Sequence, residues 1–202
     1  MENLKRLISG NERFCMGEPK KVVGTGQERS AAHANGQSPF AVILGCSDSR
    51  VPPELVFDQD IGALFVVRVA GNIATASEVG SIEFAVQTFG TPLVVVLGHT
   101  QCGAVTSALA AMEHAASPGS SNLQVIIDQV MRSVREASAN LPDAVDVSNA
   151  VRANVEATVS RLKVDSKVLG SASSDGDLLI VGAEYDLVTG RVEFFIPRTM
   201  FA

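Results

Sequence analysis

Three short stretches of this chain are apolar at nearly every position. They cover residues 40–45, 63–69 and 93–97. A strand with one face in water alternates between apolar and polar residues, whereas a strand that is apolar throughout is buried on both faces, as in a parallel sheet covered by helices. The sequence therefore predicts a mainly parallel central β-sheet.

Segments with helical periodicity separate these strands. Apolar residues recur at helical spacing from residue 79 to residue 89 and stop at Gly90, which favours a helix between the second and third strands. An Ala-rich stretch over residues 104–116 and two amphipathic stretches over residues 123–134 and 151–162 follow the third strand. Strands and helices that alternate in this way predict an α/β fold with flanking helices.

The last part of the chain carries a hairpin signal. An apolar strand over residues 178–181 is followed by the turn-forming pair Thr189-Gly190 and by a further strand over residues 192–196. This pattern is typical of a β-hairpin. We therefore expect an antiparallel strand at one edge of the sheet.

The first helix is predicted over residues 4–14, and a stretch rich in Gly, Pro and Lys follows it over residues 17–26. We expect this helix to form an arm that is set apart from the core. The 202 residues then make one domain, with an N-terminal helical arm in residues 1–35 and an α/β core in residues 36–202.

Composition narrows the possible partners and locations. The net charge is -6, and no block of Lys and Arg could form a nucleic-acid stripe, so nucleic acid is not an expected partner. The longest apolar run, residues 93–97, is too short to cross a bilayer. The first residues are charged throughout and lack the apolar segment of a secretory signal. We expect a soluble, cytoplasmic protein that does not bind membranes.

Two of the three cysteines lie where a parallel sheet binds ligands. Cys46 directly follows the first strand, and Cys102 lies after the third strand, three residues beyond His99. Ligands of open α/β sheets bind beyond the carboxyl ends of the strands. Two thiolates and an imidazole suit Zn²⁺, and three protein ligands leave the open position of a catalytic zinc. His-x-x-Cys alone is a weak signal, however, because buried cysteines commonly behave as small apolar residues.

Two charged residues lie within four positions of Cys46: Asp48 carries a carboxylate and Arg50 a guanidinium. From the residues alone, Asp48 could also do no more than cap the next helix. Redox chemistry between Cys46 and Cys102 is a further idea, but the chain has no Cys-x-x-Cys motif.

The two motifs together resemble those of the β-class carbonic anhydrases. They are Gly45-Cys46-Ser47-Asp48-Ser49-Arg50-Val51-Pro52 and Gly98-His99-Thr100-Gln101-Cys102-Gly103. The resemblance extends to other segments along the chain: Asn11-Glu12-Arg13-Phe14, Phe65-Val66-Val67-Arg68, Ala70-Gly71-Asn72, Gly80-Ser81-Ile82-Glu83-Phe84-Ala85-Val86 and Ile180-Val181-Gly182. The segments between residues 120 and 164 are predicted to be helical, as in the family, but their residues do not match it.

This resemblance implies reversible hydration of CO2 to bicarbonate and a proton. It implies one Zn²⁺ per chain on Cys46, His99 and Cys102, with hydroxide generated at the zinc and oriented by a dyad of Asp48 and Arg50. In a closed state of the family, the aspartate itself ligates zinc. Regulated, closed members carry a tryptophan at the position of Ile43, so the open form is expected here.

The resemblance also implies a substrate pocket and an oligomer. The matching pocket positions are Gln37, Phe65, Val69, Phe84 and Gly103. A polar loop role for Gln37 and a plain core role for Phe84 remain alternatives. His33 is a candidate proton carrier, although a loop histidine is usually solvated. In the family the first helix packs across a neighbouring subunit, so a homodimer or homotetramer is expected.

Two alternatives to a carbonic anhydrase stay open. Carbonyl sulfide and carbon disulfide hydrolases use the same fold and a similar attack on a linear substrate, and sequence separates them poorly from carbonic anhydrases. A zinc-binding module without catalysis is the other alternative. It would be expected to lack Asp48 or Arg50, and both are present.

Overall fold

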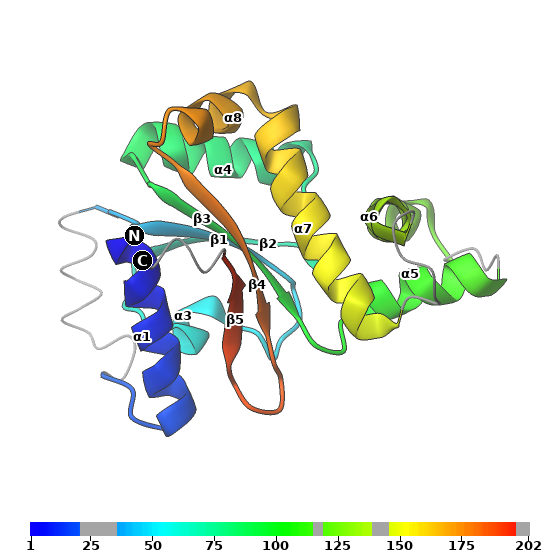
Figure 1. Ribbon diagram of the computed structural model, residues 1–202, viewed down its shortest axis with the longest axis horizontal. Helices are drawn as coiled ribbons and strands as arrows, with labels where there is room; N and C mark the ends of the chain where they lie inside the picture. Colours follow the sequence, from blue (N-terminus) through cyan, green and yellow to red (C-terminus); the bar gives the residue numbers. More distant parts are fainter. Residues whose placement is uncertain (21–35, 115–118, 139–145, 197–202) are drawn as a thin grey trace.

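The computed structural model describes residues 1–20, 36–114, 119–138 and 146–196, with a five-stranded sheet at its centre (Figure 1). The strands are β1 (Ala41–Gly45), β2 (Leu64–Arg68), β3 (Leu93–His99), β4 (Leu179–Tyr185) and β5 (Val192–Phe195). Their order is β2-β1-β3-β4-β5, and only β5 runs antiparallel to its neighbour. The predicted α/β fold with an antiparallel edge strand is confirmed.

Helices cover both faces of this sheet and extend beyond one end of it (Figure 1). The helices are α1 (Glu2–Met16), α3 (Pro53–Val56), α4 (Ala76–Phe89), α5 (Gly103–His114), α6 (Ser121–Ser138), α7 (Val147–Asp165) and α8 (Lys167–Ser174). A short 3₁₀ turn, η1 (Ala70–Asn72), follows β2. Helices α1 and α3 pack on one face, and α4, α7 and α8 pack on the other.

Strand β1 shows why the central strands lack alternation. Ile43 packs into the core cluster on the α1 side, whereas Val42 and Leu44 pack into the cluster on the α4 side. All three side chains are fully buried. Successive residues of a strand point to opposite faces, so a central strand with helices on both faces is apolar at every position.

Strands β3 and β4 are longer than the apolar runs that predicted them. We expected β3 to end at residue 97 with a turn from Gly98 onward, but the strand continues to His99. Gly98 pairs with Glu184, and His99 pairs with Tyr185. The greater length of β3 has a tertiary cause. Its hydrogen-bonded pairing with β4 extends the strand past the end of its apolar pattern.

Helix α1 is not set apart from the core, contrary to expectation. Leu4 and Leu7 are fully buried in the cluster on its side of the sheet. Asn11 donates from Nδ2 to the carbonyl oxygens of Val56 (3.1 Å) and Gly190 (2.8 Å) and accepts from the Val192 N–H (2.8 Å). Apolar burial and these bonds hold the helix on its own chain. The division into residues 1–35 and 36–202 stays a prediction.

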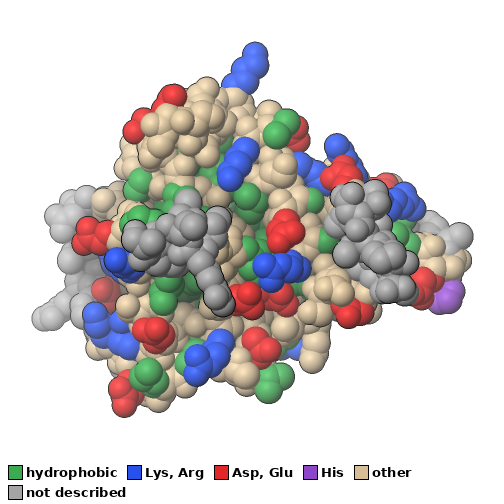
Figure 2. All heavy atoms as spheres, viewed as in Figure 1, with side chains coloured by type: hydrophobic (Ala, Val, Ile, Leu, Met, Phe, Trp, Pro, Cys, Tyr) green, Lys and Arg blue, Asp and Glu red, His purple; other side chains and the backbone are tan. Residues whose placement is uncertain are grey.

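The surface carries charges of both signs. In Figure 2, Lys and Arg side chains are scattered among Asp and Glu over the visible face. Among the described residues, none of the helices is both long and apolar enough to cross a membrane.

Candidate metal centre

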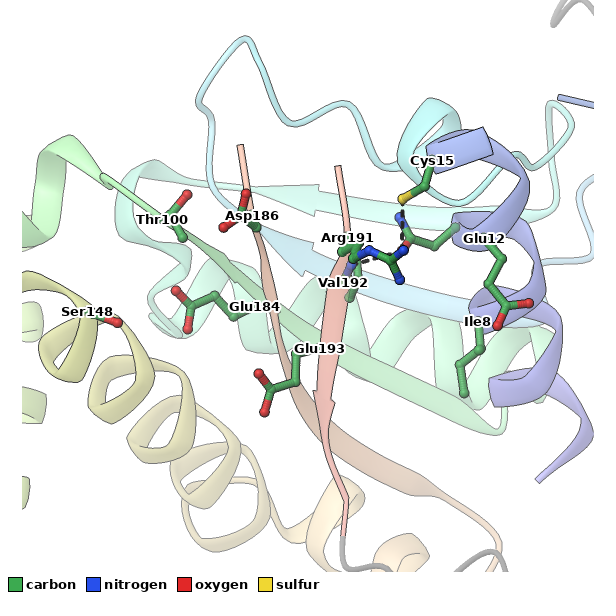
Figure 3. Close-up of a pocket in the computed structure, with 11 residues that line it drawn as sticks. Ile8, Glu12, Cys15, Thr100, Ser148, Glu184, Asp186, Arg191, Val192 and Glu193 are labelled. Atoms are coloured by element: carbon green, nitrogen blue, oxygen red, sulfur yellow. Dashed lines mark hydrogen bonds between the residues drawn. The ribbon is translucent and has the colours of Figure 1, made fainter. Parts of the chain in front are cut away.

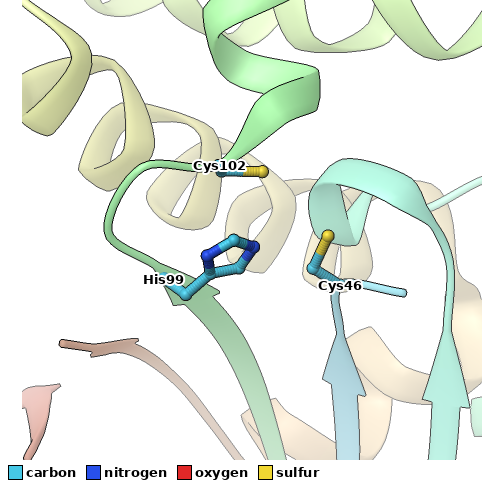
Figure 4. Close-up of side chains that lie close together, drawn as sticks. All are labelled: Cys46, His99 and Cys102. Carbon is cyan, nitrogen blue, oxygen red and sulfur yellow. The ribbon is translucent and has the colours of Figure 1, made fainter. Parts of the chain in front are cut away.

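The structure brings Cys46, His99 and Cys102 together in space (Figure 4). One ligand-capable atom from each residue lies within 4.8 Å of those of the other two. All three side chains are buried, with exposed fractions of 5%, 0% and 1%. Three convergent soft donors in a buried site are a set that can hold a zinc ion.

The sheet register creates this convergence. Strands β1 and β3 are parallel neighbours, and Gly45 stands opposite Leu97. Cys46 therefore leaves the end of β1 beside the last residues of β3, where His99 lies. The chain then turns through Gln101, which has a positive φ of 56°, so that Cys102 comes back toward the other two side chains before α5 begins.

His99 presents one ring nitrogen to the centre. Its Nδ1 lies 2.9 Å from the Thr100 carbonyl oxygen, so a proton on Nδ1 donates there and leaves a lone pair on Nε2. Nε2 is buried and has no hydrogen-bond partner among the described residues. Buried polar atoms normally have partners, so this nitrogen fits the role of a metal ligand.

The two thiols perturb each other. The hydrogen bond from Cys102 is the main cause that lowers the pKa of Cys46, and His99 lowers it further, although burial opposes the shift. The same contact with Cys46, together with burial, raises the pKa of Cys102. A divalent cation bound by both sulfurs would favour two thiolates. The donor set fits zinc.

Asp48 and Arg50 form a bidentate ion pair beside the metal-ligand candidates. Arg50 Nε donates to Asp48 Oδ1 at 2.9 Å, and Nη2 donates to Oδ2 at 2.7 Å. The Arg50 guanidinium is the main cause that holds the pKa of Asp48 well below its usual range. Asp48 Oδ2 lies 3.9 Å from His99 Nε2, so the ionised carboxylate faces the side where a metal would be bound.

Arg68, which sequence reasoning gave no role, supports the loop that carries these residues. It ends β2, and its Nε donates to the Cys46 carbonyl at 3.0 Å while its Nη2 donates to the Asp48 carbonyl at 2.6 Å. The sequence did carry one signal for this role: Arg68 is a charged residue at the carboxyl end of an otherwise apolar strand.

Gly71, in turn η1, contacts the first ligand through its backbone. Its N–H lies 3.4 Å from Cys46 Sγ. Gly71 has a φ of 72°, and a Cβ there would stand 3.1 Å from Ala104 and from Val130. Only glycine fits this position without strain. The motif Ala70-Gly71-Asn72 contributed to the resemblance, but the contact to sulfur was not predicted.

The predicted pocket residues do not all adjoin the centre. Phe65 of β2 and Phe84 of α4 lie together with Phe89, at ring-centroid distances of 5.6 to 6.3 Å, and Phe84 is 51% exposed. Val69 packs against both the sheet cluster and the cluster that holds the two cysteines. Gly103 begins α5 beside Cys102, with open space where a Cβ would lie.

Two further candidates from the sequence have no contact with the centre to report. Gln37 is exposed in the segment before β1. His33, the candidate proton carrier, lies outside the described residues.

A cavity of about 540 Å³ lies elsewhere, between α1 and the hairpin of β4 and β5 (Figure 3). Its lining includes Glu184, Asp186, Glu193 and Arg191, but none of the three metal-ligand candidates. Burial is the main cause that raises the pKa of Glu184, and the charge of Glu193 adds to it. The cavity is acidic in character, and its lining adjoins the centre only through Thr100, the residue after His99.

The fold and this centre define a class of protein: an α/β protein whose parallel strands end at a set of two cysteines and a histidine, flanked by an aspartate–arginine pair. A family model described as carbonic anhydrase matches residues 41–192. Carbonic anhydrase 2 of Mycobacterium tuberculosis is 41% identical over 187 residues, which cover 93% of this chain and 88% of that protein.

A second relative and a solved structure agree with this match. The carbonic anhydrase of Mycolicibacterium smegmatis is 39% identical over 192 residues, covering 94% of this chain and 90% of that protein. One of two tetrameric β-carbonic anhydrases from Sordaria macrospora superposes with a TM-score of 0.73 at 22% identity, covering 96% of this chain and 98% of that one, which shows the shared fold. The chain belongs to the β-class carbonic anhydrase family and is an enzyme of that class.

Proposed function

We propose that this chain hydrates CO2 to bicarbonate and a proton with one zinc ion held by Cys46, His99 and Cys102. The observation that carries the proposal is the buried Nε2 of His99, which has no hydrogen-bond partner among the described residues and lies beside two cysteine sulfurs. Zinc, when bound, supplies the Lewis acidity that makes water a nucleophile near neutral pH.

Asp48 orients the reacting water in this proposal. Its carboxylate is ionised because Arg50 holds it by two hydrogen bonds, and an ionised carboxylate accepts hydrogen bonds only. Oδ2 keeps lone-pair capacity on the side of His99 Nε2, 3.9 Å away. It can therefore accept a hydrogen bond from the water. This bond directs a lone pair of the water oxygen at the carbon of CO2.

An open resting state is part of the proposal. The pairing of Asp48 with Arg50 supports it, because a carboxylate that ligates the metal would leave that guanidinium without its partner. Ile43, fully buried in β1, stands where regulated relatives carry a tryptophan. A crystal structure near pH 7 with Asp48 coordinated to zinc would contradict this state.

The substrate pocket is proposed to include Gln37, Phe65, Val69, Phe84 and Gly103. The open space at Gly103, next to Cys102, supports access on that side. Apolar walls keep such a site dry and strengthen the electrostatic contacts inside it.

A homo-oligomer, dimer or tetramer, is proposed to complete the pocket. The exposed ring of Phe84 lies in an aromatic cluster next to β2, an edge strand of the sheet. Apolar surface of this kind is suited to cover by a second copy of the chain. The cytoplasmic location stays a prediction.

The test measures zinc content and CO2 hydration on the same sample at two pH values, beside an assay for sulfide release from carbonyl sulfide and carbon disulfide. About one zinc per chain with rapid CO2 hydration supports the proposal. Zinc without hydration indicates a binding module, and sulfide release without CO2 hydration indicates the sulfur-substrate hydrolases. A carefully prepared parent protein without zinc would reject the metal centre.

A further inference from the structure

Asn154 of α7 is a fully buried amide that neither the sequence motifs nor the proposed mechanism uses. Its Nδ2 donates to the carbonyl oxygen of Gly71 at 2.7 Å, across 83 positions of the chain. Gly71 in turn directs its N–H at Cys46 Sγ, 3.4 Å away. The two contacts join helix α7 to the first metal-ligand candidate through a single glycine.

We propose that Asn154 is a positioning residue of the metal centre, which holds turn η1 so that the Gly71 N–H stays directed at Cys46 Sγ. The inference rests on the proposed function, because it concerns the sulfur that would bind zinc.

Turn η1 needs an external anchor. It has only three residues, and Asn72 also has a positive φ, of 46°. So short a 3₁₀ turn has little stability of its own. The N–H and the carbonyl of Gly71 belong to successive peptide planes that meet at a Cα without a side chain, so rotation there is weakly restricted. The hydrogen bond from Asn154 to the carbonyl therefore supplies a fixed point on Gly71 that the turn itself lacks, and it limits how far the residue, including its N–H, can shift relative to Cys46.

The contact to sulfur affects the ligand itself. A hydrogen bond to a thiolate withdraws electron density and fixes the orientation of the sulfur, and outer partners of metal ligands typically change metal affinity or activity by about 10- to 100-fold. Gly71 is a backbone donor to Cys46 Sγ from outside the Cys46–Asp48 loop. Its alignment is therefore a direct means of tuning this ligand.

A role in packing alone accounts poorly for an amide at this position. Asn154 Oδ1 is buried and has no hydrogen-bond partner among the described residues, which costs free energy. A leucine, which has the same number of side-chain heavy atoms and no polar atom, would avoid this cost. The hydrogen bond from Nδ2 to the Gly71 carbonyl accounts for an amide at this position.

Helix α7 offers a matched control one turn further on. Thr158 is also fully buried, and its Oγ1 also has no hydrogen-bond partner among the described residues. No hydrogen bond links Thr158 to η1 within the described part of the chain. Thr158→Val removes a buried polar atom from the same helix and leaves the Gly71 contact in place.

The experiment compares the parent, Asn154→Leu, Asn154→Ala and Thr158→Val. Zinc affinity is measured by competition with a chelator, and the thiolate-to-metal charge-transfer band is recorded on the cobalt-substituted proteins. Because Asn154 acts on the sulfur through Gly71, both Asn154 variants should bind zinc more weakly by about 10-fold, the lower end of the range for direct outer partners, and shift the cobalt band. Thr158→Val should keep the affinity and the band of the parent. Unfolding midpoints are measured on all four proteins.

Three outcomes overturn the inference: Asn154 variants that fold with the parent affinity and band, a Thr158→Val variant that loses affinity equally, or two Asn154 variants that fail to fold while Thr158→Val folds. A parent that binds no zinc instead rejects the proposed function itself, so the two failures are distinguishable.

Discussion

Replacing Asp48 by asparagine removes one charge beside the metal centre and changes the side-chain shape very little. In the parent, both carboxylate oxygens accept from Arg50, at 2.9 and 2.7 Å. An asparagine has one oxygen and one NH₂ group, so one of the two guanidinium donors then faces another donor. The side chain can no longer hold the bidentate geometry, and it can no longer act as an anionic acceptor for the reacting water.

The size of the effect differs between stability, metal binding and turnover. The Asp48 and Arg50 side chains are 17% and 54% exposed, and ion pairs with this much solvent contribute little to stability. The three metal-ligand candidates are untouched, so zinc content should stay near that of the parent. A misplaced acid–base partner, in contrast, typically lowers turnover by about 10²-fold or more. We expect Asp48→Asn to fold, to keep zinc and to lose CO2 hydration by that factor.

The assay is stopped-flow CO2 hydration on protein of known zinc content, together with a thermal unfolding curve. Arg50→Ala should resemble Asp48→Asn, because Asp48 then loses its partner. Asp128→Asn is the matched control, since it makes the same chemical change outside the metal centre. Asp128 lies on the exposed face of α6 and accepts a hydrogen bond from Gln124. The control should keep full activity.

Two results would refute the reasoning. If Asp48→Asn lost zinc as readily as a variant without a cysteine ligand, Asp48 would be a metal ligand and the open state would be wrong. If it hydrated CO2 at the parent rate, the orienting role would be wrong.

The other predictions concern metal binding, packing and pH. Cys102→Ala should lower zinc occupancy measured by metal analysis, since the loss of a ligand acts on affinity before chemistry. Gly98→Ala should lower the free energy of unfolding by about 1–3 kcal/mol, because the new Cβ would lie 2.5 Å from Val155 Cγ2, and denaturant titration measures this. Glu184→Gln should raise the free energy of unfolding at pH 8, because burial and neighbouring acids raise the pKa of Glu184 and so disfavour its ionised form in the folded state.

Each of these predictions has a contrasting result. Full zinc occupancy in Cys102→Ala would remove that residue from the metal site. Gly80→Ala is the control for Gly98→Ala: it lies in helix α4 with open space around its Cα, and should stabilise the protein by roughly 1 kcal/mol. The gain from Glu184→Gln should fall as the pH drops from the raised pKa toward the unfolded value of about 4.3, and a gain that is constant with pH would contradict the assigned cause.

Local patterns in the sequence predicted the sheet and placed Cys46, His99 and Cys102 at one edge of it, and the family resemblance identified the three as metal-ligand candidates. An apolar run without alternation identifies a strand buried on both faces, and this needs no knowledge of distant residues. Parallel strands present their carboxyl ends at one edge of the sheet, so Cys46 after β1 and His99 at the end of β3 could be placed together from their positions alone.

Long-range contacts decided the rest. Asn11 bonds to residues 45 and 179 positions further along the chain, and these bonds hold α1 on the core, against the expectation of a separate arm. Arg68 holds the loop of Cys46 and Asp48, and Asn154 holds Gly71 beneath Cys46, in each case through backbone carbonyls. A bond to a backbone carbonyl leaves no mark on the identity of its acceptor residue. The sequence by itself therefore determined which side chains form the centre, whereas only the tertiary structure decided what holds them in place.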